Sequence, residues 1–230
     1  MLHRPRLIVA AGVLLAALAC AAPASARIIE VGAVATEVTP TCPSSPCLAV
    51  SRTTGYQAKV VDSRAAYLVP RRGRIVAWTI SLGNPDERQI EFFEDNYGEA
   101  SAQLTILRRG KRLFHRVIAQ TPIQELQPYF GQSVQFPLDR SIRVKKGQVV
   151  ALTVPTWAPA LTQLLDEGSS WRASRAKDTC DDTDRQTAQT RMRMRTQYRC
   201  LYRARLTYSA TLITDPRPNK TEKADTTGRK

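Results

Sequence analysis

The chain contains 230 residues, of which 34 are Lys or Arg and 20 are Asp or Glu, so its formal net charge is +14. This surplus makes polyanions the default long-range attraction, although charge alone selects no partner. The longest apolar run, residues 7–22, falls short of the roughly 20 residues that cross a bilayer, and no second run of this kind follows. A transmembrane protein is therefore not expected.

Residues 1–26 have the three parts of a cleavable secretory signal. Arg4 and Arg6 provide a positive start, the apolar run follows, and a break at Pro23 precedes a small-residue Ala-Ser-Ala site. We expect cleavage before Arg27 and export to the cell envelope or beyond it. Because two of the 34 basic residues leave with the signal, the mature chain keeps 32 against 20 acidic residues, a net charge of +12.

The five cysteines divide into one in the leader and an even set of four after it. Cys20 resembles the end of a lipoprotein signal, but its neighbours depart from that pattern, so no lipid anchor is expected there. In an oxidising compartment an even set normally pairs. We expect Cys42 and Cys47 to close a short loop, and Cys180 and Cys200 to tie an acidic loop to the next strand. Crossed pairings stay open, whereas the spacing lacks the two close pairs of a zinc site.

Alternation with a period of two is the recurrent pattern after the leader, and no stretch shows a helical repeat beyond one or two turns. Residues 74–82 place Val76, Trp78 and Ile80 on one face of a strand and Ile75 on the other. This parity predicts that Trp78 is a core anchor.

A β-hairpin is predicted where residues 100–109 and 112–119 flank a two-residue Gly-Lys loop, with Gly110 supplying positive φ. Residues 148–154 form a nearly continuous apolar run that Pro155 is expected to end. Such a run is typical of a strand covered on both faces.

The longest β pattern covers residues 191–213 and exceeds the usual length of a strand, so we expect a bend or bulge near Thr196 or Arg203. From residue 215 to residue 230 the chain has no apolar anchor, and we expect a disordered tail. Arginines occupy one parity of the long β pattern: Arg191, Arg193, Arg195, Arg199, Arg203 and Arg205.

These elements predict an all-β fold, a single antiparallel β-sandwich of jelly-roll type over residues 27–214. Residues 145–152, read as KKGQVVAL, resemble the penultimate-strand pattern of exported bacterial jelly-roll domains, including some carbohydrate-binding modules. The segments WRAS at 171–174 and CLYRARL at 200–206 are similar to secreted proteins of that kind. The resemblance implies a fold and an extracytoplasmic location, and it transfers no catalytic residue.

Catalytic motifs are sparse after the leader. His115 is the one histidine that remains, and we expect a hydrogen-bonded histidine at a sheet face. No nucleophile elbow, phosphate-binding glycine loop or metalloprotease motif is present. No cofactor is predicted.

Acidic residues cluster in two predicted loops, over residues 86–99 and behind Cys180. They suit solvated loops, a calcium site or the acids of a glycan hydrolase or lyase with Tyr97 as a helper. The oxygens of a calcium site would come from Glu94, Asp95, Asp182 and Asp184.

Two sets of residues offer binding chemistry. Trp157 and Trp171 fall in predicted non-strand segments, where an indole can stack on a sugar or close the end of the core. Arginines of the long β pattern can meet polyanions or pair with neighbouring acids. The concrete hypothesis joins the tryptophans to three of those arginines: Arg199, Arg203 and Arg205.

The leading functional prediction is an exported, non-catalytic binding or structural domain that recognises an anionic or neutral glycan. Specific nucleic-acid binding is not expected, because the tyrosines lie on the parity opposite to the arginines. A glycan-active enzyme and a cell-surface protein-interaction module are the alternatives.

Overall fold

The computed structural model describes residues 26–33, 38–61, 63–162 and 168–216. The predicted leader, apart from Ala26, and the predicted tail, apart from Asp215 and Pro216, lie outside these residues. The strands are β1 (Ile28–Val31), β2 (Val50–Lys59), β3 (Gly73–Ser81), β4 (Ser101–Arg109), β5 (Phe114–Gln120), β6 (Gln124–Glu125), β7 (Ser133–Val144), β8 (Val149–Ala158), β9 (Leu161–Thr162), β10 (Ser170–Ala173), β11 (Arg195–Gln197), β12 (Cys200–Tyr202), β13 (Arg205–Leu206) and β14 (Tyr208–Thr214). The helices are α1 (Glu87–Tyr97) and three 3₁₀ turns: η1 (Lys111–Leu113), η2 (Gln127–Tyr129) and η3 (Lys177–Thr179).

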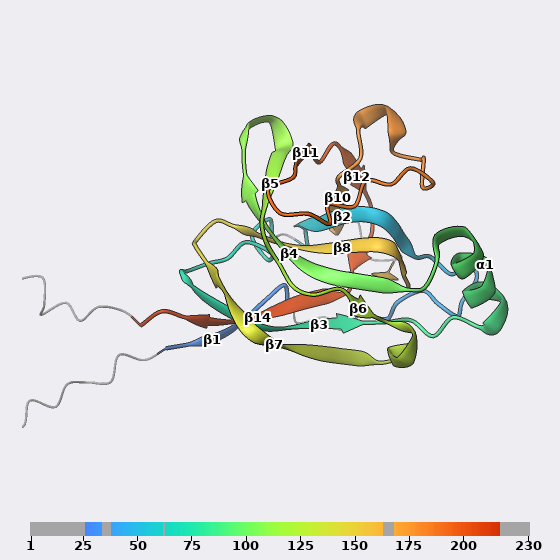
Figure 1. Cartoon of the computed structure of the whole chain (residues 1–230), viewed down its shortest axis with the longest axis horizontal. Helices are drawn as coiled ribbons and strands as arrows, with labels where there is room; N and C mark the ends of the chain where they lie inside the picture. Colours follow the sequence, from blue (N-terminus) through green and yellow to red (C-terminus); the bar gives the residue numbers. More distant parts are fainter. Residues whose placement is uncertain (1–25, 34–37, 62, 163–167, 217–230) are drawn as a thin grey trace, which may run out of the picture. The chain divides into compact units, whose positions relative to one another are not determined.

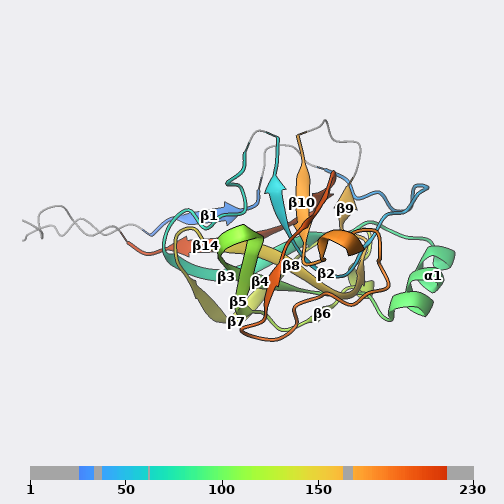
Figure 2. The same ribbon diagram turned by 90° about the horizontal axis from the view of Figure 1, so that it is seen from above.

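Two antiparallel sheets pack against each other, which confirms the all-β sandwich (Figures 1 and 2). The first sheet has the order β1-β14-β3-β7. The second has the order β11-β5-β4-β8-β2-β10-β12, with β6 added to β4, and it curls strongly into a half-barrel. The short strands β9 and β13 pair separately. The jelly-roll type is not confirmed by this strand order.

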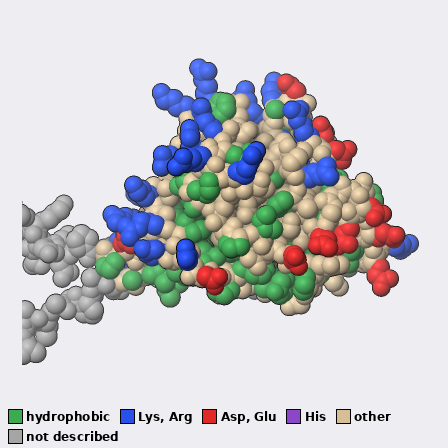
Figure 3. All heavy atoms as spheres, in the orientation of Figure 1, with side chains coloured by type: hydrophobic (Ala, Val, Ile, Leu, Met, Phe, Trp, Pro, Cys, Tyr) green, Lys and Arg blue, Asp and Glu red, His purple; other side chains and the backbone are tan. Residues whose placement is uncertain are grey.

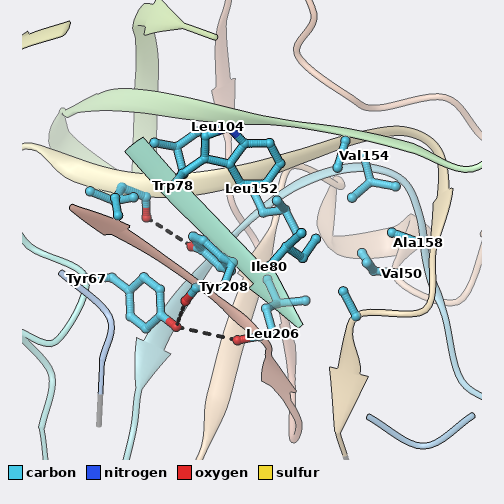
Figure 4. Packing of buried hydrophobic residues seen from close by; sticks show 14 of the residues in the cluster. Val50, Tyr67, Trp78, Ile80, Leu104, Leu152, Val154, Ala158, Leu206 and Tyr208 are labelled. Atoms are coloured by element: carbon cyan, nitrogen blue, oxygen red, sulfur yellow. Dashed lines mark hydrogen bonds between the residues drawn. The ribbon is translucent and has the colours of Figure 1, made fainter. Parts of the chain in front are cut away.

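The core lies between the two sheets (Figure 4). Trp78 and Ile80 of β3 face Leu104 of β4 and Leu152 of β8, and all four side chains are buried. Tyr208 also lies within the core and donates its hydroxyl to the carbonyl of Val150 at 3.0 Å. Trp78 is therefore a core anchor, as its parity predicts.

The faces predicted for the two β3 residues Ile75 and Val76, which precede Trp78 in the strand, are wrong. Ile75 is fully buried in the same core, whereas Val76 is only partly buried. Pairing with both neighbouring strands skips Val76, so a bulge there shifts the side-chain alternation by one residue.

Strand β8 is buried on both faces, as predicted, but Pro155 does not end it. The strand continues to Ala158 through a bulge, in which Pro155 and Thr156 of β8 lie opposite the single residue Arg52 of β2. Arg52 is the residue skipped in the pairing, and its φ of 45° marks the irregularity. A proline without an N–H is tolerated where a bulge interrupts the ladder.

The predicted hairpin is present as β4 and β5, but its loop is longer than two residues. Arg109 pairs with His115, and η1 lies between them. Positive φ occurs at Arg112 and Leu113, with values of 53° and 63°, whereas Gly110 has a φ of −125°. The prediction for Gly110 is therefore wrong.

Helix α1 corrects the prediction that residues 86–99 form a loop. Asp86 caps it, because its carboxylate accepts from the backbone N–H of Gln89 while the Gln89 side chain accepts from the backbone N–H of Asp86, both at 2.9 Å. This is a capping box, and Gly98 with a φ of 84° follows the last turn. Within the described residues, no helix is long and apolar enough to span a membrane.

The region 191–213 is not one strand with a bend or bulge near Thr196 or Arg203. Residues 191–194 are not in a strand, Thr196 lies within β11, and the remaining residues are divided among β11, β12, β13 and β14, with one of the interruptions at Arg203. Both predicted disulfides are formed. Cys42 pairs with Cys47, and Cys180 pairs with Cys200.

Candidate functional site

Three arginines form a row across adjacent strands of the curled sheet. Arg108 of β4 lies directly opposite Arg116 of β5, which in turn lies opposite Arg195 of β11. Directly opposed residues in antiparallel strands project from the same face. We call Arg108, Arg116 and Arg195 the arginine row, and all three side chains are exposed.

The surroundings of the arginine row are basic. Residues 100–124 and 185–214, which contain the row, include no acidic residue. Between described residues, the one ion pair is that of Arg72 with Asp215, at 2.8 Å. The guanidinium of Arg195 lies 4.5 Å from the ring centroid of Phe114, which is the aromatic contact of the row.

Charge is segregated over the surface. Figure 3 shows basic side chains gathered around the β4–β5 hairpin and acidic side chains gathered around α1. Residues 86–99 contain six acids and the single base Arg88. The hairpin side of the domain therefore carries a positive potential that neighbouring acids do not neutralise.

The two tryptophans predicted to bind a sugar are buried. The exposed fraction is 0% for Trp157 and 4% for Trp171, so neither indole presents a face to solvent. Phe93 of α1 stacks on Trp157 with ring centroids 4.6 Å apart, and Tyr202 covers Trp171 at the same distance. These side chains close the core, which is the second of the two roles weighed from the sequence.

The three arginines predicted to accompany the tryptophans do not share one exposed face. Arg199 and Arg203 are exposed, whereas Arg205 is only 7% exposed in the short strand β13. The breaks in the long β pattern separate the arginines into different strands. Of that set, Arg195 is the one that joins the arginine row.

The acidic residues do not form a metal centre among the described residues, where no three His, Cys, Asp or Glu side chains gather. Glu94 and Asp95 lie on α1, whereas Asp182 and Asp184 lie in the loop after Cys180. The six acids at 86–99 follow one exposed helix rather than opposite walls of a cleft.

The sequence did not predict the arginine row. Its three residues are brought together by the pairing register of the strands, which a local pattern does not specify. The signal available was the acid-free hairpin with Arg108 and Arg116 on its two arms. Arg195 is almost 80 positions away from Arg116, and no local pattern connects them.

The other face of the curled sheet forms the interior of the half-barrel. His115 of β5 lies between Tyr56 of β2 and Tyr198, with ring centroids at 5.0 and 4.9 Å. Leu107 and Val117 complete a second apolar cluster here. The segment between Ser174 and Cys200 covers this interior, and the Cys180–Cys200 disulfide closes the covering segment.

One end of the half-barrel is filled by a buried polar network. The Thr153 hydroxyl lies 2.8 Å from that of Thr54 and 2.6 Å from that of Thr105. Gln189, in the covering segment, donates its backbone N–H to Thr54 and accepts from the Tyr198 hydroxyl at 2.7 Å. The network fixes the covering segment to three strands of the sheet.

Burial sets the protonation states inside the half-barrel. It raises the pKa of the Tyr198 phenol well above its usual value and raises the pKa of Tyr56. It lowers the pKa of His115, and the charges of Arg109 and Arg172 lower it further. A hydrogen bond from His115 to the carbonyl of Leu113 acts in the opposite direction. His115 is therefore neutral at pH 7.

Comparison of the chain with protein-family models, with curated proteins and with solved structures finds no match. Its function therefore has to be inferred from the residues and geometry described above.

Proposed function

We propose that this chain is an exported, non-catalytic domain that binds anionic glycans of the cell envelope or the extracellular space, with the arginine row as the contact surface. Two disulfides support a location in an oxidising compartment, because such bonds are rare where thiols are kept reduced. The predicted leader is consistent with the same location.

The single observation that carries this proposal is the direct opposition of three like charges. Like charges that face each other directly across strands are destabilising. No acidic residue of the flanking segments neutralises the charges of Arg108, Arg116 and Arg195. At about 4.8 Å between neighbouring strands, the row spreads three guanidinium groups over about 10 Å. A polymer with repeated anionic groups offsets their repulsion and receives three contacts at once.

Glycans suit this surface better than single-stranded nucleic acid. Platforms for single strands interleave cations with aromatic rings that stack on the bases. The row has one such ring, Phe114, and Arg195 already covers it. Phe92 is a large exposed aromatic residue, 59% accessible, but it lies on α1 among the acids.

Binding to an anionic polysaccharide such as heparin, measured over a range of salt concentrations, tests the proposal. The test variant is R108Q/R116Q/R195Q. The matched control is R64Q/R88Q/R140Q, which removes the same charge from three exposed arginines outside the row. Counterion release predicts a slope of log K against log salt that falls by about 2 to 3 in the test variant, since each lost contact contributes about 0.7–0.9. The control keeps most of the slope.

Equal losses in the two variants would show that net charge, and not the row, binds the polymer. Absence of binding by the natural chain at low salt would remove the proposal. Tighter retention on a DNA duplex than on the polysaccharide would replace the glycan with nucleic acid.

A further inference from the structure

A second set of cations lies on the opposite face of the same hairpin, at the mouth of the half-barrel. Arg109 is directly opposite His115 in the β4–β5 pair, and Arg172 is directly opposite Tyr56 in the β10–β2 pair. The rings of Tyr56 and His115 are 5.0 Å apart, so the curl brings the two pairs together. We call these four residues the quartet.

Arg109 and Arg172 lie on either side of the Tyr56–His115 pair, each opposite one of its two residues. Each is near enough to shift the titration of both Tyr56 and His115. Arg172 donates only long hydrogen bonds, of 3.4 and 3.3 Å, to the carbonyls of Tyr198 and Arg199. Among the described residues, neither Arg109 nor Arg172 has a carboxylate within 4.0 Å.

One ring nitrogen of His115 forms a hydrogen bond, and the other has no partner among the described residues. A carbonyl oxygen can only accept, so the Nδ1 of His115, 2.9 Å from the oxygen of Leu113, carries the proton. Its Nε2 is buried and has no hydrogen-bond partner among the described residues, and the residue is 3% exposed. The charged groups and phenols that face this ring are Arg109 from β4, Tyr56 from β2, Arg172 from β10 and Tyr198 from the covering segment.

We propose that Arg109 and Arg172 bind a single oxyanion beside the Tyr56–His115 pair, and that this binding is coupled to protonation of His115. With no anion present, two nearby positive charges oppose a third charge on the imidazole. A carboxylate, sulfate or phosphate group between the guanidiniums neutralises them and makes the imidazolium favourable. Tyr56 is partly exposed, and a phenol hydroxyl can act as a further donor.

This site is separate from the arginine row. Arg109 follows Arg108 in the same strand, and consecutive residues of a strand project to opposite faces. The oxyanion site therefore receives one anionic group on a small molecule or a chain end, whereas the row contacts a polymer along its length.

Nuclear magnetic resonance of the imidazole ring tests the site directly. His115 is the one histidine after the predicted leader, so the imidazole resonances of the mature chain belong to it. The probes are sulfate and glucuronate, since both keep their charge between about pH 5 and pH 8. We expect either or both, at about 10 mM, to raise the pKa of His115 by about one unit. By linkage, the anion then binds about tenfold more tightly below the His115 pKa than above it.

Arg109→Gln is expected to abolish this response, and Lys111→Gln, which removes one charge from the same hairpin, is expected to preserve it. Because Arg109 is exposed, its replacement leaves the packing of the half-barrel intact. Arg172→Gln provides a second test from the other strand, and Tyr56→Phe isolates the phenol hydroxyl.

Each outcome is decisive for the site. A response to sulfate alone identifies a tetrahedral oxyanion, and a response to glucuronate alone identifies a carboxylate; both support the proposal. An unchanged His115 pKa with both anions overturns it, as does an equal response in Arg109→Gln. The triple variant R108Q/R116Q/R195Q is expected to lose polysaccharide binding but to keep the sulfate response, so the two proposals fail independently.

Discussion

The rings of Tyr56 and His115 lie 5.0 Å apart, although two strands, β8 and β4, separate β2 from β5 in the sheet order. In a flat sheet three strand spacings amount to about 14 Å. The sheet is therefore curled, and its pairing has bulges at Arg52 in the β2–β8 pair and beside Ile106 in the β4–β5 pair, where bulges increase local bending.

His115 makes the stability of the domain depend on pH. Its folded pKa lies below 6.5, so between the folded and unfolded pKa values the unfolded chain binds the additional proton. The contribution of His115 to the free energy of unfolding is therefore fully present above pH 6.5 and is lost as the pH drops below that value. The slope from this residue is at most about 1.4 kcal/mol per pH unit.

Urea unfolding of the natural chain and of His115→Gln between pH 5 and pH 8 measures this contribution. The variant is expected to lose less stability than the natural chain on acidification. A constant difference between the two at every pH would contradict the assignment.

Tyr67 makes the stability of the domain depend on pH under alkaline conditions. Burial raises the pKa of Tyr67 to about 12, while the nearby Arg205 acts in the opposite direction. The unfolded phenol ionises near 10, so stability declines as the pH rises from 10 towards 12. Phenolate absorbance, followed together with circular dichroism, is expected to show Tyr67 ionising only as the fold is lost.

Tyr67→Phe is the matching variant at neutral pH. The Tyr67 hydroxyl donates to the carbonyl of Tyr208 at 2.6 Å in the core (Figure 4). Its removal leaves a buried acceptor, and we expect a loss of about 1–3 kcal/mol in the free energy of unfolding. A loss near zero would show that another donor reaches that carbonyl.

The two disulfides are expected to contribute unequally. The loop that Cys180 and Cys200 close is longer than the loop closed by Cys42 and Cys47. Loop-closure entropy predicts losses of about 3 and about 2 kcal/mol when each pair is replaced by serine. Urea unfolding of C180S/C200S and C42S/C47S compares them, and the reverse order would point to strain or to structure in the unfolded chain.

The helix cap offers a local test. Asp86→Ala removes the acceptor that holds the N–H of Gln89 and is expected to cost about 1 kcal/mol, whereas Asp86→Asn retains most of the cap. Unfolding monitored by far-ultraviolet circular dichroism reports both variants. Identical losses with Ala and Asn would assign the effect to charge rather than to capping.

Fold class was predictable because alternation reports strands directly. Trp78 in the core, the β4–β5 hairpin and both cysteine pairs followed from local pattern and spacing. The face predicted for Ile75 was wrong because a bulge at Val76 shifts the alternation. A bulge depends on the register with neighbouring strands, which the local pattern does not show. Helix α1 was not predicted, although its capping residues are present in the sequence. None of its residues is fully buried, so it lacks the strong apolar stripe by which a helix is recognised.

The candidate sites were less predictable, for the same reason. The arginine row and the quartet are defined by which residues oppose each other in pairs that join distant parts of the chain. Tryptophans in predicted non-strand segments suggested a sugar surface, but Trp157 lies in β8 and Trp171 in β10. Once a strand places them on its inner face, their apolar area is buried with the core.

Separation of charge between the hairpin and α1 gives the domain an electric dipole in addition to its net charge. A negatively charged wall therefore exerts a torque as well as an attraction during approach. Under the proposed function, the domain would therefore meet such a surface with Arg108 and Arg116 towards it and α1 away from it. Phe92, which is exposed on α1, would then lie on the side of the domain away from that surface.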